Sequence, residues 1–207
     1  AAWAQSNNIK ERNLTPIDKL SFIGQRSMGA LEFEPSNKIS QDNDFSLDEL
    51  YHKAQEILQK REDTVVAGKD ISLESLYEVG TSAGGQHTKA IIARNNHTGE
   101  IRSGQILLPS EYTYYILKFA EKDYYPLTII EMVYSEMAKL AGITMMPSEL
   151  IKIDGDYHFL TERYDRKDGK KIHTQTLAAM NPEASSYEDL MDVCDELNLP
   201  YKEKEET

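Results

Sequence analysis

A glycine-rich loop that leads directly into a β-type run constrains the fold of this chain more than any other feature. The loop spans residues 80–89 (GTSAGGQHTK), and residues 90–94 (AIIAR) follow it. Glycine amides can approach phosphate oxygens without a Cβ in the way, so the loop is a candidate phosphate cradle; a flexible turn before a strand is the alternative. The P-loop and the dinucleotide-binding fingerprint must each open a helix. The β-branched run therefore argues against both.

Alternating and turn-bounded stretches predict an antiparallel sheet around this loop. Turn residues 95–99 join the strands on either side of them as a hairpin. The pair Asp154-Gly155 supplies the two positive φ values of a type I′ turn, which predicts a second hairpin. Between the hairpins, an alternating stretch places Lys118 on a face with otherwise apolar neighbours. The expected strands are residues 31–34, 90–94, 100–108, 112–119, 150–153 and 157–164.

Capping residues and apolar spacing predict the helices. Ser46 and Glu49 have the spacing of a capping box. Thr128 is expected to cap a second helix, which Gly142 ends. One face of that helix carries Ile130, Val133, Tyr134, Met137, Leu140 and Ala141. The expected helices are residues 46–59, 128–141 and 186–197, with a turn or helix start at Thr15-Pro16 and either a short helix or a strand at 71–79.

Charge and composition narrow the class of protein. The 23 Lys and Arg residues against 35 Asp and Glu give a net charge of −12, so we expect no direct binding of nucleic acid, whose affinity comes mainly from cations on phosphates. No apolar run approaches the roughly 18 residues of a spanning helix, so no membrane association is expected. The single cysteine, Cys194, excludes an internal disulfide and favours a reducing cytoplasm. The five histidines lack the spacing of metal ligands, so no metal site is predicted.

The order of these features fits the architecture of protein kinases. There, a glycine-rich loop lies over the nucleotide, a lysine follows on a later strand and a glutamate on the next helix. Lys118 and Glu131 take those two places, and the strand at 159–164 would lead into the hinge that meets adenine. Each residue has an alternative interpretation: Lys118 as a strand-end lysine that extends into solvent, and Glu131 as the capping-box partner of Thr128.

Five motifs in a fixed order resemble the HipA family of serine/threonine kinase toxins. They lie at residues 22–33, 80–85, 116–119, 159–166 and 171–179, so the resemblance spans nearly the whole chain. It implies an α+β fold with a kinase-like N-terminal lobe, in which helices pack on a twisted antiparallel sheet. The implied divisions are residues 1–40 as the remnant of a HipA-like N-terminal subdomain, 41–70 as a helical connector, 71–165 as the kinase-like ATP-binding lobe and 166–207 as the start of a truncated helical lobe.

The resemblance also implies a ligand, ATP, and a set of residues that bind it. Glu131 would pair with the phosphate-binding lysine, and Ser82, or else Thr81, would be autophosphorylated. The loop departs from the family form at His87-Thr88, where one acidic residue is expected, and this leaves the register of Lys89 open. The implied ATP-binding residues are Thr81, Ser82, Ala83, Gly84, Gly85, Gln86, Lys89, Lys118, Glu162, Arg163 and Tyr164.

The partners implied by the resemblance are proteins. Members of the family phosphorylate protein hydroxyls, often on aminoacyl-tRNA synthetases, and a DNA-binding antitoxin of the HipB type restrains them. We therefore expect a protein substrate and a HipB-like antitoxin as partners of this chain.

The residues that carry out phosphoryl transfer are not found in the sequence. A kinase needs an aspartate that orients the substrate hydroxyl and an Asn/Asp pair that holds magnesium. Tyr164-Asp165-Arg166 superficially resembles a catalytic loop, but Lys170 stands where the metal-binding Asn is needed, so surface or capping roles are expected there. We expect an ATP-binding fragment that is inactive alone, with magnesium bound in the full-length protein. The alternatives are a non-catalytic module that binds an antitoxin or a companion subunit, and one half of a split toxin.

Overall fold

The computed structural model describes residues 14–36, 44–45, 51–52, 89–121 and 125–205. The glycine-rich loop before Lys89 lies outside these residues, as do most of the helix expected at 46–59 and all of the ambiguous stretch at 71–79.

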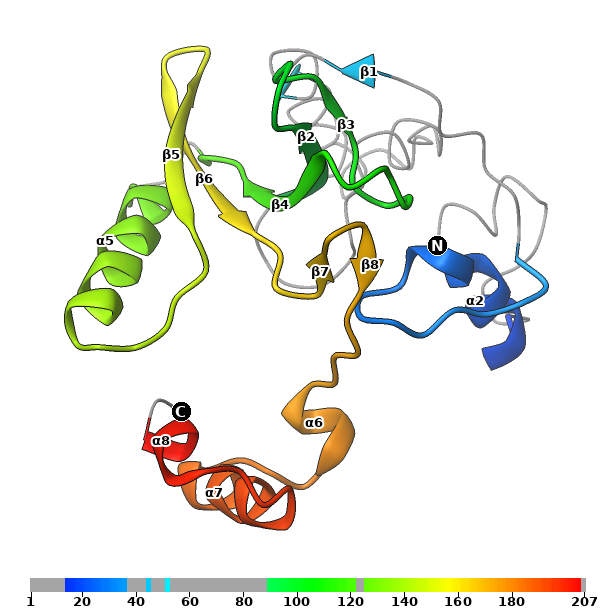
Figure 1. Ribbon diagram of the computed structural model, residues 1–207, viewed down its shortest axis with the longest axis vertical. Helices are drawn as coiled ribbons and strands as arrows, with labels where there is room; N and C mark the ends of the chain where they lie inside the picture. Colours follow the sequence, from blue (N-terminus) through cyan, green and yellow to red (C-terminus); the bar gives the residue numbers. More distant parts are fainter. Residues whose placement is uncertain (1–13, 37–43, 46–50, 53–88, 122–124, 206–207) are drawn as a thin grey trace, which may run out of the picture.

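A six-stranded antiparallel sheet forms the centre of the described chain (Figure 1). Its strands stand in the order β1-β3-β2-β4-β6-β5, so the hairpin strands β2 and β3 and the hairpin strands β5 and β6 flank the central strand β4. The bounds are β1 Asp44–Phe45, β2 Lys89–Asn95, β3 Ile101–Ser103, β4 Tyr112–Lys118, β5 Ser148–Ile153 and β6 Asp156–Glu162. Both predicted hairpins are therefore confirmed, and the strand expected at 100–108 ends earlier, at Ser103.

The turn between β5 and β6 shows why a two-residue signal predicts a hairpin. Asp154 has φ 50° and Gly155 has φ 93°, the positive values that a type I′ turn requires at both central positions. The turn fixes the register, so that Ile153 pairs with Asp156 and Leu150 with Phe159.

Of the helices, α5 packs against the strands β5 and β6, and α6, α7 and α8 continue the chain beyond the sheet (Figure 1). Thr15 caps α2 through a complete capping box with Asp18, and Ser186 caps α7 in the same way with Asp189. The helices are α2 Pro16–Ile23, the short 3-10 turn η2 Gly24–Arg26, α5 Leu127–Leu140, α6 Leu177–Met180, α7 Tyr187–Glu196 and α8 Tyr201–Glu205, and a small second sheet pairs β7 Arg166–Lys167 with β8 Lys170–Lys171. None of the helices in the described ranges is long and apolar enough to cross a membrane.

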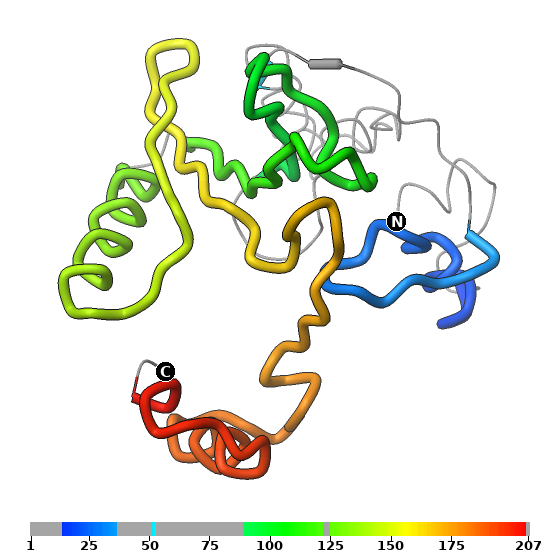
Figure 2. Tube along the Cα trace, in the orientation of Figure 1, coloured from blue at the N-terminus to red at the C-terminus, as the bar shows by residue number. Residues whose placement is uncertain are grey.

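The two ends of the described chain take different positions relative to the sheet. Figure 2 shows the C-terminal part, orange to red, extending away from the sheet, whereas the N-terminal part, dark blue, lies beside the chain that follows the sheet. Lys171 of β8 reaches this N-terminal part, where it forms an ion pair with Glu32 at 2.8 Å.

One expectation for the N-terminal part is wrong. Residues 31–34 form no strand, because the amide of Phe33 donates its hydrogen bond to the carbonyl of Gly24 and so folds back on the preceding helix end. At the other end, the charged run from Lys202 lies in the short helix α8, which has no buried residues, and Lys204 forms an ion pair there with Asp195 of α7.

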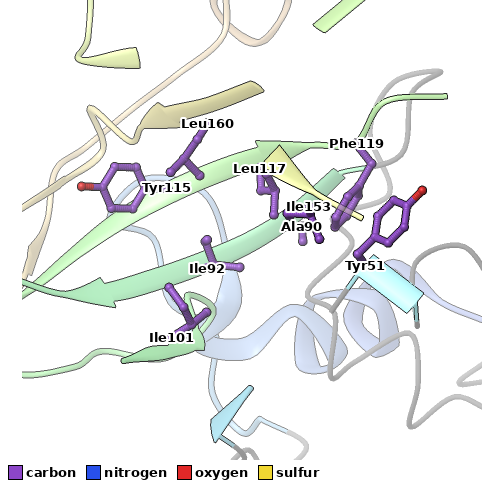
Figure 3. Close-up of a cluster of buried hydrophobic side chains, with 9 residues drawn as sticks. All are labelled: Tyr51, Ala90, Ile92, Ile101, Tyr115, Leu117, Phe119, Ile153 and Leu160. Carbon is purple, nitrogen blue, oxygen red and sulfur yellow. The ribbon is translucent and has the colours of Figure 1, made fainter. Parts of the chain in front are cut away.

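The core of the sheet is divided between its two faces by the alternation of β4. Tyr115, Leu117 and Phe119 lie in one buried cluster, which Figure 3 shows together with residues from β2, β3, β5 and β6. Tyr112 and Tyr114 lie in a second cluster with Ala93 and Leu108. The alternation predicted for residues 112–119 is therefore confirmed, and it places Lys118 on the face opposite Leu117 and Phe119.

The predicted apolar face of the helix after β4 does not point to the core. Thr128 and Ser135 of α5 are buried, whereas Tyr134 is 66% exposed and Leu140 is 89% exposed. Apolar spacing predicted the helix correctly, but the residues that share its apolar face are not those that lie against the sheet, where the hydroxyl of Thr128 donates a hydrogen bond to the carbonyl of Tyr157.

Candidate functional site

Lys118 and Glu131 meet at the end of β4. The ammonium Nζ of Lys118 lies 2.9 Å from Oε1 of Glu131 and 2.8 Å from Oε2, and both side chains are about one third exposed (32% and 33%). A partly exposed ion pair of this kind adds little to stability. Its effect is to hold the Lys118 ammonium in a fixed place at the end of β4. Because an ammonium group has three hydrogen-bond donors, it can still donate to a ligand.

Thr128 does not bind Glu131, so the Glu131 side chain can reach Lys118 at the end of β4. Its hydroxyl donates a hydrogen bond of 2.7 Å to the carbonyl of Tyr157 in β6, and the residue before α5 at the N-cap position is Pro126. The predicted capping role of Thr128 is therefore wrong. The hydroxyl instead fastens the first turn of α5 to the sheet, and this contact places Glu131, three residues later, above Lys118.

Lys89, the first residue of β2, lies directly across from Lys118 in the strand pair. Residues paired in this way point to the same face, with Cα atoms about 4.5–5.5 Å apart, so two like charges stand side by side. Glu131 neutralises one of them. Together the three side chains carry one net positive charge at the point where the glycine-rich loop joins the sheet.

A small open pocket adjoins this ion pair. It lies between the end of β4 and the start of α5, and the Nζ atom of Lys118 is also 5.8 Å from the centroid of the Phe159 ring. The pocket is lined by Lys118, Phe119, Glu121, Tyr125, Leu127, Thr128 and Glu131. Residues 81–86, which were predicted to complete the site, lie outside the described residues.

The predicted hinge residues differ from one another in their surroundings. The amide of Glu162 donates to the carbonyl of Pro147 and the amide of Arg163 to the carbonyl of Tyr114, both at 2.9 Å, so neither amide is available to a base. The Tyr164 side chain is 57% exposed. Because Glu162 pairs with Tyr115, three residues before Lys118, the predicted hinge residues begin about 10 Å along the strand from the ion pair.

A buried charge cluster follows the predicted hinge residues, and the sequence did not reveal it. Asp165, expected to be a surface or capping residue, is fully buried (0% exposed), and Arg163 and Arg166 are only 3% and 6% exposed. Arg163 binds both oxygens of Asp165 at 2.8 Å through Nε and Nη2, and Nη1 of Arg166 lies 2.9 Å from Oδ2. The expectation failed because the partners that bury this carboxylate lie far away in the sequence, around Gly29.

Electrostatics keeps Asp165 ionised in this cluster. Burial alone would raise the pKa of its carboxyl group, but the hydrogen bonds from Arg163 and Gly29 and the charges of the two guanidinium groups outweigh burial and lower the pKa. Burial and the neighbouring charge of Arg163 lower the pKa of Arg166. The cluster holds two cations and one anion, so it depends on backbone carbonyls to accept the remaining guanidinium hydrogens.

His158 lies fully buried beneath the end of β4. Its Nδ1 atom accepts a hydrogen bond of 2.9 Å from the amide of Ala120, so its Nε2 atom carries the proton and faces the carbonyl of Ile153 at 3.3 Å. The rings of Tyr51 and Phe119 pack against it, with centroids 5.0 Å and 5.6 Å away. Burial lowers the pKa of His158, in spite of the Ile153 carbonyl and the charge of Asp156.

This burial predicts acid sensitivity near neutral pH. The unfolded chain takes up a proton on this histidine below its ordinary pKa of about 6.5 and the folded chain does not, so the free energy of unfolding is highest above pH 6.5. As the pH falls below 6.5, stability decreases by up to about 1.4 kcal/mol per pH unit until the folded pKa is reached. Urea unfolding at pH 7.5, 6.5 and 5.5 measures the effect.

Two variants test whether His158, and not another histidine, causes this pH dependence of stability. His158→Asn, which keeps an acceptor for the amide of Ala120, should be less stable at pH 7.5 and should show a flatter dependence on pH. His97→Gln, in an exposed turn, should retain the dependence of the wild type. Equal slopes for the wild type and His158→Asn would refute the assignment.

Comparisons with known proteins place this chain in a family. The family model described as HipA-like C-terminal domain matches residues 81–207. A solved structure of the toxin–antitoxin system HipA, HipB and its operator DNA from Shewanella oneidensis MR-1 is similar with a TM-score of 0.51 and 16% identity, over 92% of this chain and 47% of that chain. This likeness shows the α+β fold, and the present chain spans about half the length of the matched one. No curated protein matches the sequence.

Proposed function

We propose that this chain, which belongs to the HipA family, is the ATP-binding part of a HipA-like serine/threonine protein kinase. One observation carries the proposal: the Lys118–Glu131 ion pair stands at the end of the sheet where the glycine-rich loop joins β2. Kinases hold the nucleotide phosphates with such a lysine, oriented by a glutamate on the next helix.

The residues around this pair suit the phosphates of ATP. The net positive charge of Lys89, Lys118 and Glu131 favours an anion, and the amides of residues 81–86 would surround its oxygens. Tyr164 and the carbonyls of Glu162 and Arg163 would contact the base. Bound ATP supplies the phosphoryl group, and in this role the chain's own residues bind and orient it.

The chain itself is proposed to be inactive without further catalytic residues. Asp165 follows Tyr164 in a sequence that resembles a catalytic loop, but its two oxygens accept hydrogen bonds from Arg163, Arg166 and Gly29. A carboxylate held in this way cannot also orient a substrate hydroxyl. The catalytic aspartate and the magnesium ligands would come from the remaining part of the protein or from a companion chain.

The proposed partners are proteins. A HipB-like antitoxin would restrain the kinase, and the substrate would be a protein hydroxyl, with an aminoacyl-tRNA synthetase as the family precedent. Since the net charge is −12, any contact with DNA would be made by the antitoxin. The proposal also includes a cytoplasmic location and autophosphorylation at Ser82 or Thr81.

Replacing Lys118 with methionine should weaken ATP binding by about 10- to 150-fold, the loss expected when a charged hydrogen-bond partner worth about 1.5–3 kcal/mol is removed. Isothermal titration of the chain with magnesium and ATP measures the dissociation constant. The control is Lys152→Met, since Lys152 is an exposed lysine on strand β5 of the same sheet that stacks on Tyr157. Unchanged affinity in Lys118→Met would refute the site and support a module that binds only proteins.

Glu131→Gln should weaken ATP binding less than Lys118→Met, because glutamine removes the charge that orients the ammonium and leaves the ammonium in place. The matched control is Glu136→Gln, since Glu136 is an exposed residue on the same helix, paired with Lys139. The same titration ranks the variants, and an effect of Glu131→Gln no larger than that of Glu136→Gln would contradict the orienting role.

A further inference from the structure

The N-terminal segment at residues 27–29, here named the strap, is held against the chain that follows the hinge. The amide of Gly29 donates a hydrogen bond of 2.8 Å to Oδ2 of Asp165. Arg166 donates to the carbonyls of Ser27 at 3.1 Å and Gly29 at 3.3 Å. The strap therefore supplies one donor to the buried carboxylate and two acceptors to the buried guanidinium.

On its other side, the strap lies in close contact with the backbone of Thr174. Gly29 has φ +71°, and a Cβ built on it would lie 3.0 Å from the amide nitrogen and 3.1 Å from the carbonyl oxygen of Thr174. The strap thus lies between the charge cluster and the chain after β8, and only glycine fits there without displacement.

The same cluster fixes the course of the hinge. Arg163 donates to the carbonyl of Gly104 at 3.3 Å and to the sulfur of Met28 at 3.2 Å, and its amide binds Tyr114. Its side chain is buried and needs the charge of Asp165 beside it. Because Tyr164 lies between Arg163 and Asp165 in the chain, the position of Tyr164 depends on both.

We infer that the strap is a positioning element of the nucleotide site, acting through Asp165 and Arg163 on the hinge. The inference rests on the proposed function, since it names the part of the chain that sets the geometry of the base-binding end. Coupling between two sites is reciprocal, so bound nucleotide must in turn hold the strap more firmly in place.

The test compares two glycines that differ in the space available for a Cβ atom. Gly29 and Gly99 both have positive φ, so alanine strains the backbone at either, but a Cβ on Gly99 would meet nothing within 4 Å. Gly29→Ala should weaken the binding of magnesium and ATP by at least about fivefold, the lower end of typical coupling between sites. Gly99→Ala should bind as the wild type does.

Hydrogen exchange supplies a readout that a merely structural role would not change. Adding magnesium and ATP to the wild-type chain should slow exchange at the amide of Gly29, which donates to Asp165, and should not do so in Lys118→Met. This measurement needs no destabilising variant, so it decides the question even where Gly29→Ala does not fold.

The outcomes separate the two proposals. A wild type that binds ATP, with equal affinity in both glycine variants and unchanged exchange at the strap, overturns the positioning role and leaves the proposed function standing. A wild type that does not bind ATP overturns both. Slower exchange at the strap together with the selective loss in Gly29→Ala supports both.

Discussion

Asp165→Ala is expected to lower the free energy of unfolding by about 3–5 kcal/mol, the usual cost of breaking a buried ion pair by removing one partner. The substitution would leave the guanidinium groups of Arg163 and Arg166 buried without a counter-charge and the amide of Gly29 without an acceptor. Urea unfolding followed by circular dichroism at pH 7 measures the loss.

Two further variants make this result specific. Asp192→Ala removes an exposed aspartate from α7 and should change stability by less than about 0.5 kcal/mol. Asp165→Asn keeps the shape and one acceptor oxygen, so its loss should be intermediate. Since the pKa of Asp165 is lowered in the folded chain, the stability that its charge supplies is present above the unfolded value of 3.8 and is lost as the pH falls through the folded pKa. A loss below about 1 kcal/mol for Asp165→Ala at pH 7 would contradict the cluster as described.

Phe119→Ala should cost about 3–5 kcal/mol, as truncation of a buried phenylalanine does when the surrounding core cannot collapse. The side chain is 2% exposed, and its ring packs against those of Tyr51 and His158, with centroids 6.1 Å and 5.6 Å away. Because Phe119 directly follows Lys118, the cavity should also loosen the end of β4 and weaken ATP binding. Urea unfolding and the ATP titration measure the two effects.

The controls for Phe119 vary volume and exposure. Phe119→Leu keeps most of the volume and should cost less than Phe119→Ala. Leu107→Ala, at a residue that is 51% exposed, should have an effect near zero. Equal losses in Phe119→Ala and Leu107→Ala would show that this core does not support the sheet.

The parts of the fold that the sequence predicted are those that neighbouring residues determine. The Asp154-Gly155 turn, the alternation along β4 and the helix expected at 186–197 each depend on residues close together in the sequence, and each is confirmed. Thr128 shows the limit of this reasoning. Its spacing from Glu131 satisfies the capping rule, but the carbonyl of Tyr157 and the ammonium of Lys118, both distant in sequence, take the two side chains instead.

Likewise, one part of the candidate site could be predicted from the sequence and another part could not. The order of loop, strand and helix selected Lys118 and Glu131, and the structure brings the two together. ATP as the ligand stays a prediction, as do the roles of residues 81–86. The environment of Asp165 could not be predicted, because no pattern within residues 163–166 indicates that a segment 136 positions earlier supplies its partner.

That separation has a consequence for how the newly made protein acquires its shape. The segment at residues 27–29 leaves the ribosome long before the arginines that will bind it, so during synthesis it has no partner for most of the chain's length. Contacts between such distant positions form slowly, since the entropy cost of closing a long loop comes before the contacts can stabilise the chain. We expect the strap to bind the arginines among the last events of folding, after both hairpins have formed.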